Sequence, residues 1–136
     1  MMVLSSNRRY YSYILCLSLI LLSISTLLFL FVKNYFYLLL ILFLAIEFIL
    51  LSTKFTQLIR IDEGRINIIY YRFLFKKQIC FNISEIKIEA DYSGSYRSPK
   101  HFILKILIQK EVVYTIDERD GFTAQDLIRI KDVYSI

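Results

Sequence analysis

Two long apolar stretches near the start of the chain constrain what it can fold into. Residues 11–32 form a run of 22 without a formal charge, and residues 35–51 form a run of 17 with one charge. As helices they would measure about 33 Å and about 26 Å, close to the thickness of the hydrocarbon core of a bilayer. Because only Lys33 and Asn34 separate them, the two helices must run antiparallel. The sequence therefore predicts a transmembrane helical hairpin over residues 1–52.

Most charged residues lie in the rest of the chain. Residues 1–52 carry four of them, while residues 53–136 carry twenty-five and have a net charge of +3. These 84 residues are enough for one small soluble domain and too few for a large multidomain enzyme. A charge of +3 is too weak to indicate a nucleic-acid partner, but it suits a domain close to anionic lipid headgroups.

The cations near the two spans indicate an orientation. Five of them lie at the outer ends of the hairpin: Arg8, Arg9, Lys54, Arg60 and Arg65. The connecting turn carries only Lys33. Because loops rich in Lys and Arg stay on the cytoplasmic side, we expect both termini in the cytoplasm. The first stretch is longer than the apolar part of a signal peptide and no small-residue cleavage site follows it, so we expect an uncleaved, two-pass anchor.

Glu47 is the ionisable residue inside a predicted span. One interpretation is a buried carboxylate that handles protons or cations, or that hydrogen-bonds to the other helix. The alternative is that Glu47 lies about 7 Å from the cytoplasmic end of its helix and reaches lipid headgroups or Lys54. We expect the second arrangement, because the first span offers no charged partner.

The hydrophobic pattern changes to a period of two in the second part of the chain, which predicts β-strands. Alternating residues mark six of them: 57–61, 65–75, 79–83, 86–90, 102–108 and 112–116. Lys76–Lys77 is expected to form a turn after the second strand. Residues 123–134 have helical spacing, and Thr123 is a suitable N-cap. We therefore expect an α+β, mainly β domain over residues 53–136.

The predicted strand over residues 65–75 is apolar on both faces. A strand in a sheet with one solvated face would be polar on that face, so this pattern does not fit such a sheet. Either the strand is covered on both sides within a closed, barrel-like sheet, or its aromatic face is held for a partner, a second copy or the bilayer.

Three segments of the second part are marked by their apolar and turn residues: the Ile61–Ile66 hairpin, the stretch Asn82–Ile88 and the helix after Gly121. Together they resemble the bacterial pleckstrin-homology-like (PH-like) domain. The resemblance implies a strongly bent antiparallel sheet, a partly closed barrel, that is closed by a C-terminal helix. It also implies a bacterial inner membrane, since such domains often follow a two-helix anchor. Phosphoinositide binding is not implied, because no such signature is evident.

The sequence offers no set of residues for catalysis. A hydrolase needs a nucleophile, a base and an acid that converge, and the chain has one histidine, His101. Cys16 and Cys80 lie in different parts of the chain and have no partner at metal-ligand spacing. The glycines form no phosphate-binding loop. We therefore expect no enzyme activity, no metal and no cofactor.

The longest polar break in the second part is the candidate ligand site. Its side chains are Tyr92, Tyr96, Arg97, Lys100 and His101. Tyrosines stack or hydrogen-bond, and Arg and Lys attract anions such as a headgroup phosphate or an acidic partner surface. The alternative is a solvated, mobile loop whose polar residues only keep the chain soluble.

These features favour a non-enzymatic inner-membrane protein. Its cytoplasmic domain would bind a partner protein, a second copy of itself to form a homo-oligomer, or an anionic lipid headgroup. One alternative is a ligand-sensing effector that disrupts the membrane in stress or antiphage defence. Another is an accessory or immunity subunit of a larger membrane complex.

Overall fold

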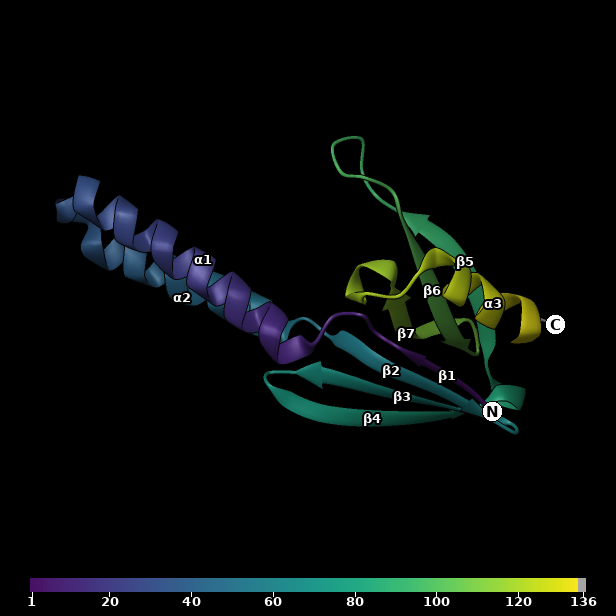
Figure 1. Cartoon of the computed structure of the whole chain (residues 1–136). Coiled ribbons are helices and arrows are strands. Elements are labelled where there is room, and N and C mark those ends of the chain that lie inside the picture. Colours follow the sequence, from purple (N-terminus) through teal and green to yellow (C-terminus); the bar gives the residue numbers. More distant parts are fainter. Residues whose placement is uncertain (135–136) are drawn as a thin grey trace.

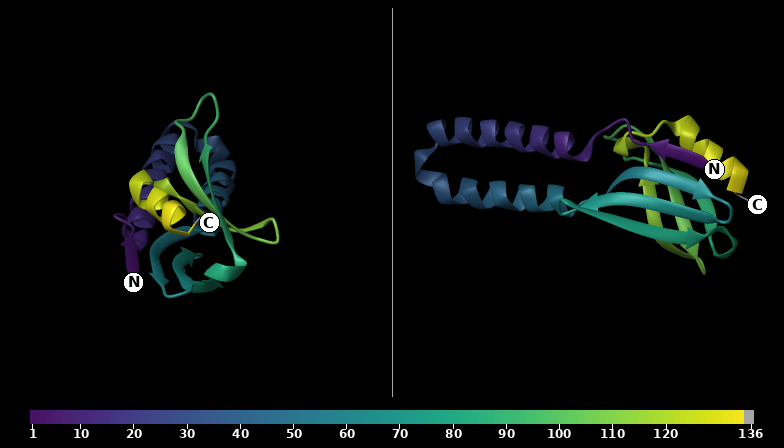
Figure 2. Two further views of the ribbon diagram at one scale, coloured as in Figure 1. Left: turned by 90° about the vertical axis from the view of Figure 1, so that its right-hand side faces the viewer. Right: turned by 60° about the horizontal axis from the view of Figure 1, so that its bottom comes forward.

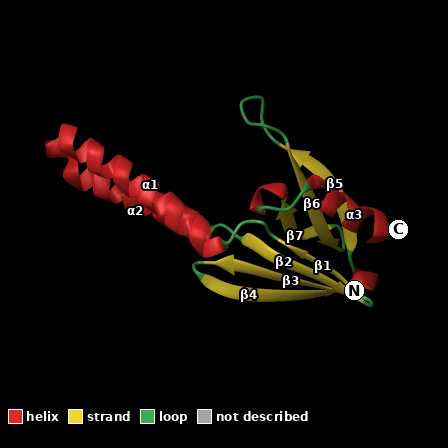
Figure 3. Cartoon of the chain, viewed as in Figure 1, coloured by secondary structure: helices red, strands yellow, loops and turns green. Residues whose placement is uncertain are grey.

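A computed structural model describes residues 1–134, and residues 135–136 of the predicted domain lie outside the described part. Two paired helices extend from a body of β-strands, and a third helix covers that body (Figures 1 and 3). The helices are α1 (Tyr10–Phe31), α2 (Phe36–Ser52) and α3 (Ala124–Tyr134), and the 3₁₀ turns are η1 (Lys33–Tyr35), η2 (Ile83–Glu85) and η3 (Glu118–Asp120). The strands are β1 (Met2–Ser5), β2 (Phe55–Asp62), β3 (Arg65–Arg72), β4 (Phe75–Asn82), β5 (Lys87–Ser93), β6 (His101–Ile108) and β7 (Glu111–Asp117).

Helices α1 and α2 form the expected hairpin. They lie side by side in every view, and η1 makes the tight connection at their far end (Figure 2). Both are long and apolar enough to cross a membrane, and most of their large apolar side chains are exposed. The predicted spans are confirmed as antiparallel apolar helices whose ends differ from the prediction by one residue.

The strands form two antiparallel sheets, with the orders β1-β2-β3-β4 and β5-β6-β7. Neither sheet is closed, and the strands are divided between two sheets where the sequence analysis expected one bent, partly closed sheet. The 3₁₀ turn η2 redirects the chain after β4, and β4 and β5 therefore belong to different sheets. The coarser expectation of an antiparallel β domain with a C-terminal helix is confirmed.

The inner faces of the two sheets and α3 share one hydrophobic core. Its most completely buried members are Ile59, Ile61, Ile66, Ile68, Leu104, Ile106, Ile116, Leu127 and Ile130. Helix α3 packs on β5 and β6. It begins where expected, because the Asp126 amide donates to Thr123 Oγ1 at 3.2 Å and so satisfies one of the free amides of the first turn.

Strand β1 comes from residues that the sequence analysis assigned to the membrane part. It pairs antiparallel with β2, with Met2 opposite Ile61 and Leu4 opposite Ile59. Met2 and Leu4 pack against the core, whereas Val3 lies on the exposed face. Met2, Val3 and Leu4 are all apolar, so the segment shows no alternation from which a strand could be recognised in the sequence. The helical hairpin is therefore an insertion between two neighbouring strands of one sheet.

The turn between β3 and β4 lies at Phe73–Leu74 and not at Lys76–Lys77, so the predicted turn position is wrong. Phe73 and Leu74 have φ of 51° and 65°. Such turns usually hold Asn or Gly, and bulky residues there are rare, so the sequence pattern did not indicate a turn. The predicted strand over residues 65–75 therefore ends at Arg72.

Candidate functional site

A groove of about 780 Å³ lies between the foot of the hairpin and the segment β7–η3. The linker between β1 and α1 forms one wall and is held against η3. The Asn7 amide donates to the Gly121 carbonyl at 3.0 Å, and the Ser6 hydroxyl donates to the Asp120 carbonyl. Gly121 has a φ of 100°, and a Cβ there would meet Ser6 and Arg8. Glycine is therefore what permits the close approach of the linker.

Two cations in the groove have no acidic partner. Arg8 Nη1 donates to the Arg119 carbonyl at 3.1 Å, and its guanidinium lies 5.8 Å from the ring centre of Tyr13. Lys54 Nζ lies 5.3 Å from the ring centre of Tyr114. Within residues 1–134, neither cation forms an ion pair with a carboxylate. Because an aromatic face holds a cation without neutralising it, both charges are available to an anion.

Two carboxylates also line the groove. Burial would raise the pKa of Asp117, but hydrogen bonds from Arg119, one of them 2.7 Å long, outweigh this and leave that pKa lowered. Burial raises the pKa of Asp120 to about 6, although the Thr56 amide donates to its Oδ2 at 3.0 Å. Asp120 therefore loses its negative charge just below neutral pH, which makes the groove more positive.

A second hollow, of about 440 Å³, continues the groove and shares Arg8 and Arg119 with it. Lys100 and His101 line this hollow, so the structure brings two of the predicted site residues beside two cations of the linker and η3. The His101 side chain is mostly buried, and its Nε2 lies 3.4 Å from Asp117 Oδ2 without a hydrogen bond. Together the two hollows form a band around the linker that is lined by four cations and by the acids Asp117, Glu118 and Asp120.

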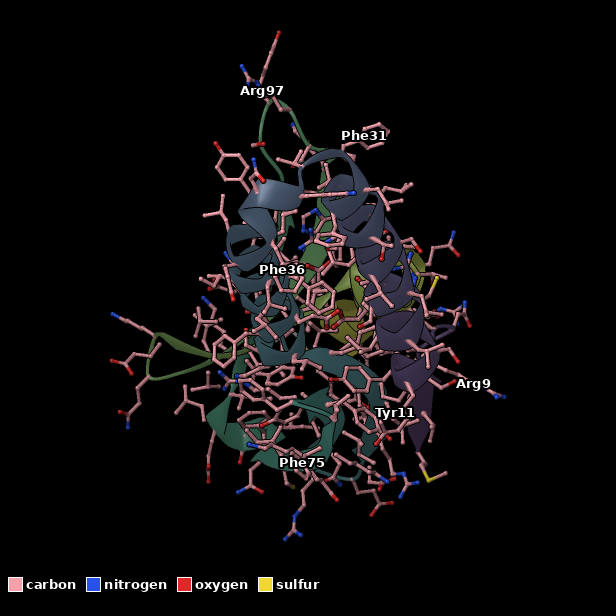
Figure 4. All side chains as sticks on the ribbon, turned by 90° about the vertical axis from the view of Figure 1, so that its left-hand side faces the viewer. Arg9, Tyr11, Phe31, Phe36, Phe75 and Arg97 are labelled. Atoms are coloured by element: carbon pink, nitrogen blue, oxygen red, sulfur yellow. The ribbon has the colours of Figure 1, made fainter. Side chains whose placement is uncertain are left out.

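The other three predicted site residues lie apart from this band. Tyr96 is fully exposed, and Tyr92 is exposed at the end of β5 with its ring edge-on to Phe102. Figure 4 shows Arg97 at the tip of the β5–β6 loop, clear of the helices. The five residues proposed from the sequence therefore do not form one site.

Glu47 does not reach Lys54 or the end of its helix as expected. Its Oε2 accepts a hydrogen bond of 3.1 Å from Ser18 Oγ on α1, and its Oε1 is buried without a partner among the described residues. A carboxylate surrounded by apolar side chains gains more from a hydroxyl donor on the facing helix than from a distant cation. Glu47 thus joins the two helices, the interpretation that the sequence analysis did not favour.

The groove can attract and orient an anion. Arginine and lysine together suit phosphate, because a guanidinium donates in a planar fork and an ammonium adds a point charge. In the part of the chain that the structure describes, no group of three His, Cys, Asp or Glu side chains could hold a metal ion. The chain matches no family model, no curated protein and no solved structure.

Sequence reasoning missed most of the groove. Arg8 and Lys54 flank the two spans, and a tight hairpin necessarily brings the flanking residues together, so this part of the site had a signal in the sequence. Arg119 and Asp120 had none, because only the packing of η3 against the linker places them there.

Proposed function

We propose that this chain is a non-enzymatic membrane protein whose soluble domain binds the phosphate of an anionic lipid headgroup in the groove. The observation that carries the proposal is the convergence of Arg8 and Lys54 in one groove, two cations without acidic partners among the described residues. This groove lies where α1 begins and α2 ends. A hairpin that spans a bilayer places both of these points at the level of the headgroups.

We place the soluble domain on the cytoplasmic face of a bacterial inner membrane. The cations at the foot of the hairpin outnumber the single Lys33 at its far turn, which favours the cytoplasmic side for the foot. The pairing of β1 with β2 keeps the chain before and after the hairpin on one side. We also propose a PH-like domain, supported by the order of antiparallel strands followed by a closing helix.

The test uses the full chain in a zwitterionic detergent. A ligand that binds only the folded state raises the stability, by about 2.7 kcal/mol at a hundred times its Kd. We expect short-chain phosphatidylglycerol to raise the unfolding temperature and phosphatidylcholine to leave it unchanged. The double variant Arg8→Gln and Lys54→Gln should lose the shift caused by phosphatidylglycerol.

The matched control is Arg9→Gln with Arg60→Gln, which removes the same charge from two exposed cations outside the groove. It should keep the shift. Equal losses from both pairs would show that only the overall charge matters, and the groove would not be the site. An equal shift with inorganic phosphate alone would identify a soluble anion as the ligand. No shift with any anion would refute the proposal and favour a protein partner or a second copy.

A further inference from the structure

The turn between β3 and β4 is fastened to both helices of the hairpin. The Phe73 amide donates to the Leu51 carbonyl of α2 at 2.7 Å. At Leu74, the amide donates to the Tyr10 hydroxyl at 3.2 Å and the carbonyl accepts from the Tyr11 hydroxyl at 3.1 Å. We call residues 73–75 the apolar tip. These bonds fix the tip at the level where α1 begins and α2 ends.

The apolar tip presents large apolar side chains to its surroundings. Leu74 is 46% exposed and Phe75 is 71% exposed. Figure 4, seen from the side of the helices, shows Phe75 beside the foot of the hairpin. Lys76 and Lys77 follow directly and are exposed as well. An apolar end followed by two cations fits the boundary between acyl chains and anionic headgroups.

The β6–β7 turn provides a comparison within the same domain. Gln109 and Lys110 have φ of 50° and 71°, nearly the values of Phe73 and Leu74. This polar turn lines a hollow with Glu85 of η2, at the end of the domain away from the helices (Figure 2). Both turns carry the same backbone strain, so turn geometry does not explain why only the one beside the hairpin is apolar.

The length of α2 determines what covers the apolar tip. Together with η1, helix α2 makes a span of 20 residues, Lys33–Ser52, about 30 Å long, which matches the thickness of the hydrocarbon core. Its last turn must therefore lie at the boundary of that core. Leu51, which accepts the bond from the tip, belongs to this last turn. Lipid that surrounds the hairpin consequently also meets Leu74 and Phe75.

We infer that the apolar tip inserts into the interfacial layer of the leaflet that the hairpin enters, with Lys76 and Lys77 on the headgroups. The tip is then a third membrane contact, besides the two helices, and it fixes how the domain is tilted over the bilayer. This surface is separate from the groove and requires only that the hairpin crosses a bilayer.

The test measures the depth of the tip with tryptophan, which the chain lacks. Phe75→Trp introduces a single reporter at the tip, and Glu111→Trp is the matched control, since each residue is the first one after its turn. The full chain is reconstituted into vesicles of phosphatidylcholine and phosphatidylglycerol with brominated acyl chains. We expect tryptophan at position 75 to be quenched several-fold more than at position 111, with emission shifted to shorter wavelength.

Two further variants separate the possible failures. Phe43→Trp, in the middle of α2, should be strongly quenched; if it is not, the hairpin is outside the bilayer and the inference is wrong. Equal quenching at positions 75 and 111, whether weak or strong, would show that the tip has no contact of its own. The Arg8→Gln and Lys54→Gln changes should leave the quenching at position 75 unchanged, so the groove can fail while the tip inserts.

Discussion

Asp120 lies beneath the groove and has lost most of the water that would stabilise its charge. Its Oδ2 accepts a hydrogen bond from the amide of Thr56, but burial outweighs this and raises its pKa from 3.8 to about 6. In the folded state the carboxyl therefore holds its proton at pH values where the unfolded chain has already released it. The free energy of unfolding must fall as the pH rises through this window, because the folded state binds more protons there.

We predict that Asp120→Asn removes this pH dependence. The amide oxygen of Asn retains the bond from Thr56, while the buried charge disappears. The variant should match the unchanged chain near pH 4 and exceed its free energy of unfolding by at most about 3 kcal/mol near pH 8. Urea unfolding of the full chain in a nonionic detergent at several pH values measures this.

Asp117→Asn is the control for the Asp120 prediction, and its effect should have the opposite sign. The pKa of Asp117 is lowered in the folded state by Arg119, so its charge stabilises the fold above the unfolded pKa and this contribution is lost as the pH falls. Asp117→Asn should therefore destabilise the chain at neutral pH. An unchanged pH profile in Asp120→Asn would show that Asp120 is not desolvated.

At the scale of single elements, the two strained turns have different surroundings. Phe73–Leu74 lies against the ends of α1 and α2, and Gln109–Lys110 lies at the other end of the domain. A residue with a side chain at positive φ costs of order 1 kcal/mol, which glycine largely avoids. We therefore expect an apolar contact of the Leu74 side chain with its surroundings to offset this cost.

We predict that Lys110→Gly raises the free energy of unfolding of the full chain by about 1 kcal/mol, because it relieves the strain and removes no apolar contact. Leu74→Gly relieves the same strain but loses the contact of Leu74 with detergent or lipid, so it should give little or no gain. Urea unfolding of both variants in the same micelles makes the comparison. An equal gain in both would mean that Leu74 makes no useful apolar contact.

At the scale of the whole molecule, the membrane anchor is inserted into the β domain. Strand β1 precedes the hairpin and β2 follows it, and the two strands pair through four pairs of residues. The Ser6 amide also donates to the Gln57 carbonyl at 2.8 Å. The chain therefore enters and leaves the hairpin at nearly the same place, and the domain is incomplete until both helices have been made.

We predict that residues 53–136 alone do not form the native domain. Without β1, one edge of β2 is unpaired and the core loses Met2 and Leu4, which destabilises the fragment by roughly 2–3 kcal/mol and favours aggregation. Residues 1–8 joined to residues 55–136 by about six Gly and Ser residues should fold as a soluble monomer. Light scattering and cooperative urea unfolding distinguish the two. A stable monomer of residues 53–136 would refute the requirement for β1.

The sequence by itself determined the features that depend on neighbouring residues. The two spans follow from uninterrupted apolar length, the strands from β5 to β7 follow from alternation, and the start of α3 follows from Thr123 and its capping bond. Each of these is a property of a short window, and the physical cause acts within that window. The basic ends of the hairpin belong to the same class, because the connection between the spans is so short.

Only the tertiary structure decided the features that join distant residues. Examples are the pairing of β1 with β2, the bond from Ser18 to Glu47 and the place of Arg119 beside Arg8. Strand pairing and helix contacts depend on which surfaces remain to be buried once the elements have formed, and the sequence carries no local signal for that choice. The turn at Phe73–Leu74 has the same origin, since neither residue favours positive φ. The pairing of β3 with β4 and the bonds to both helices fix its place.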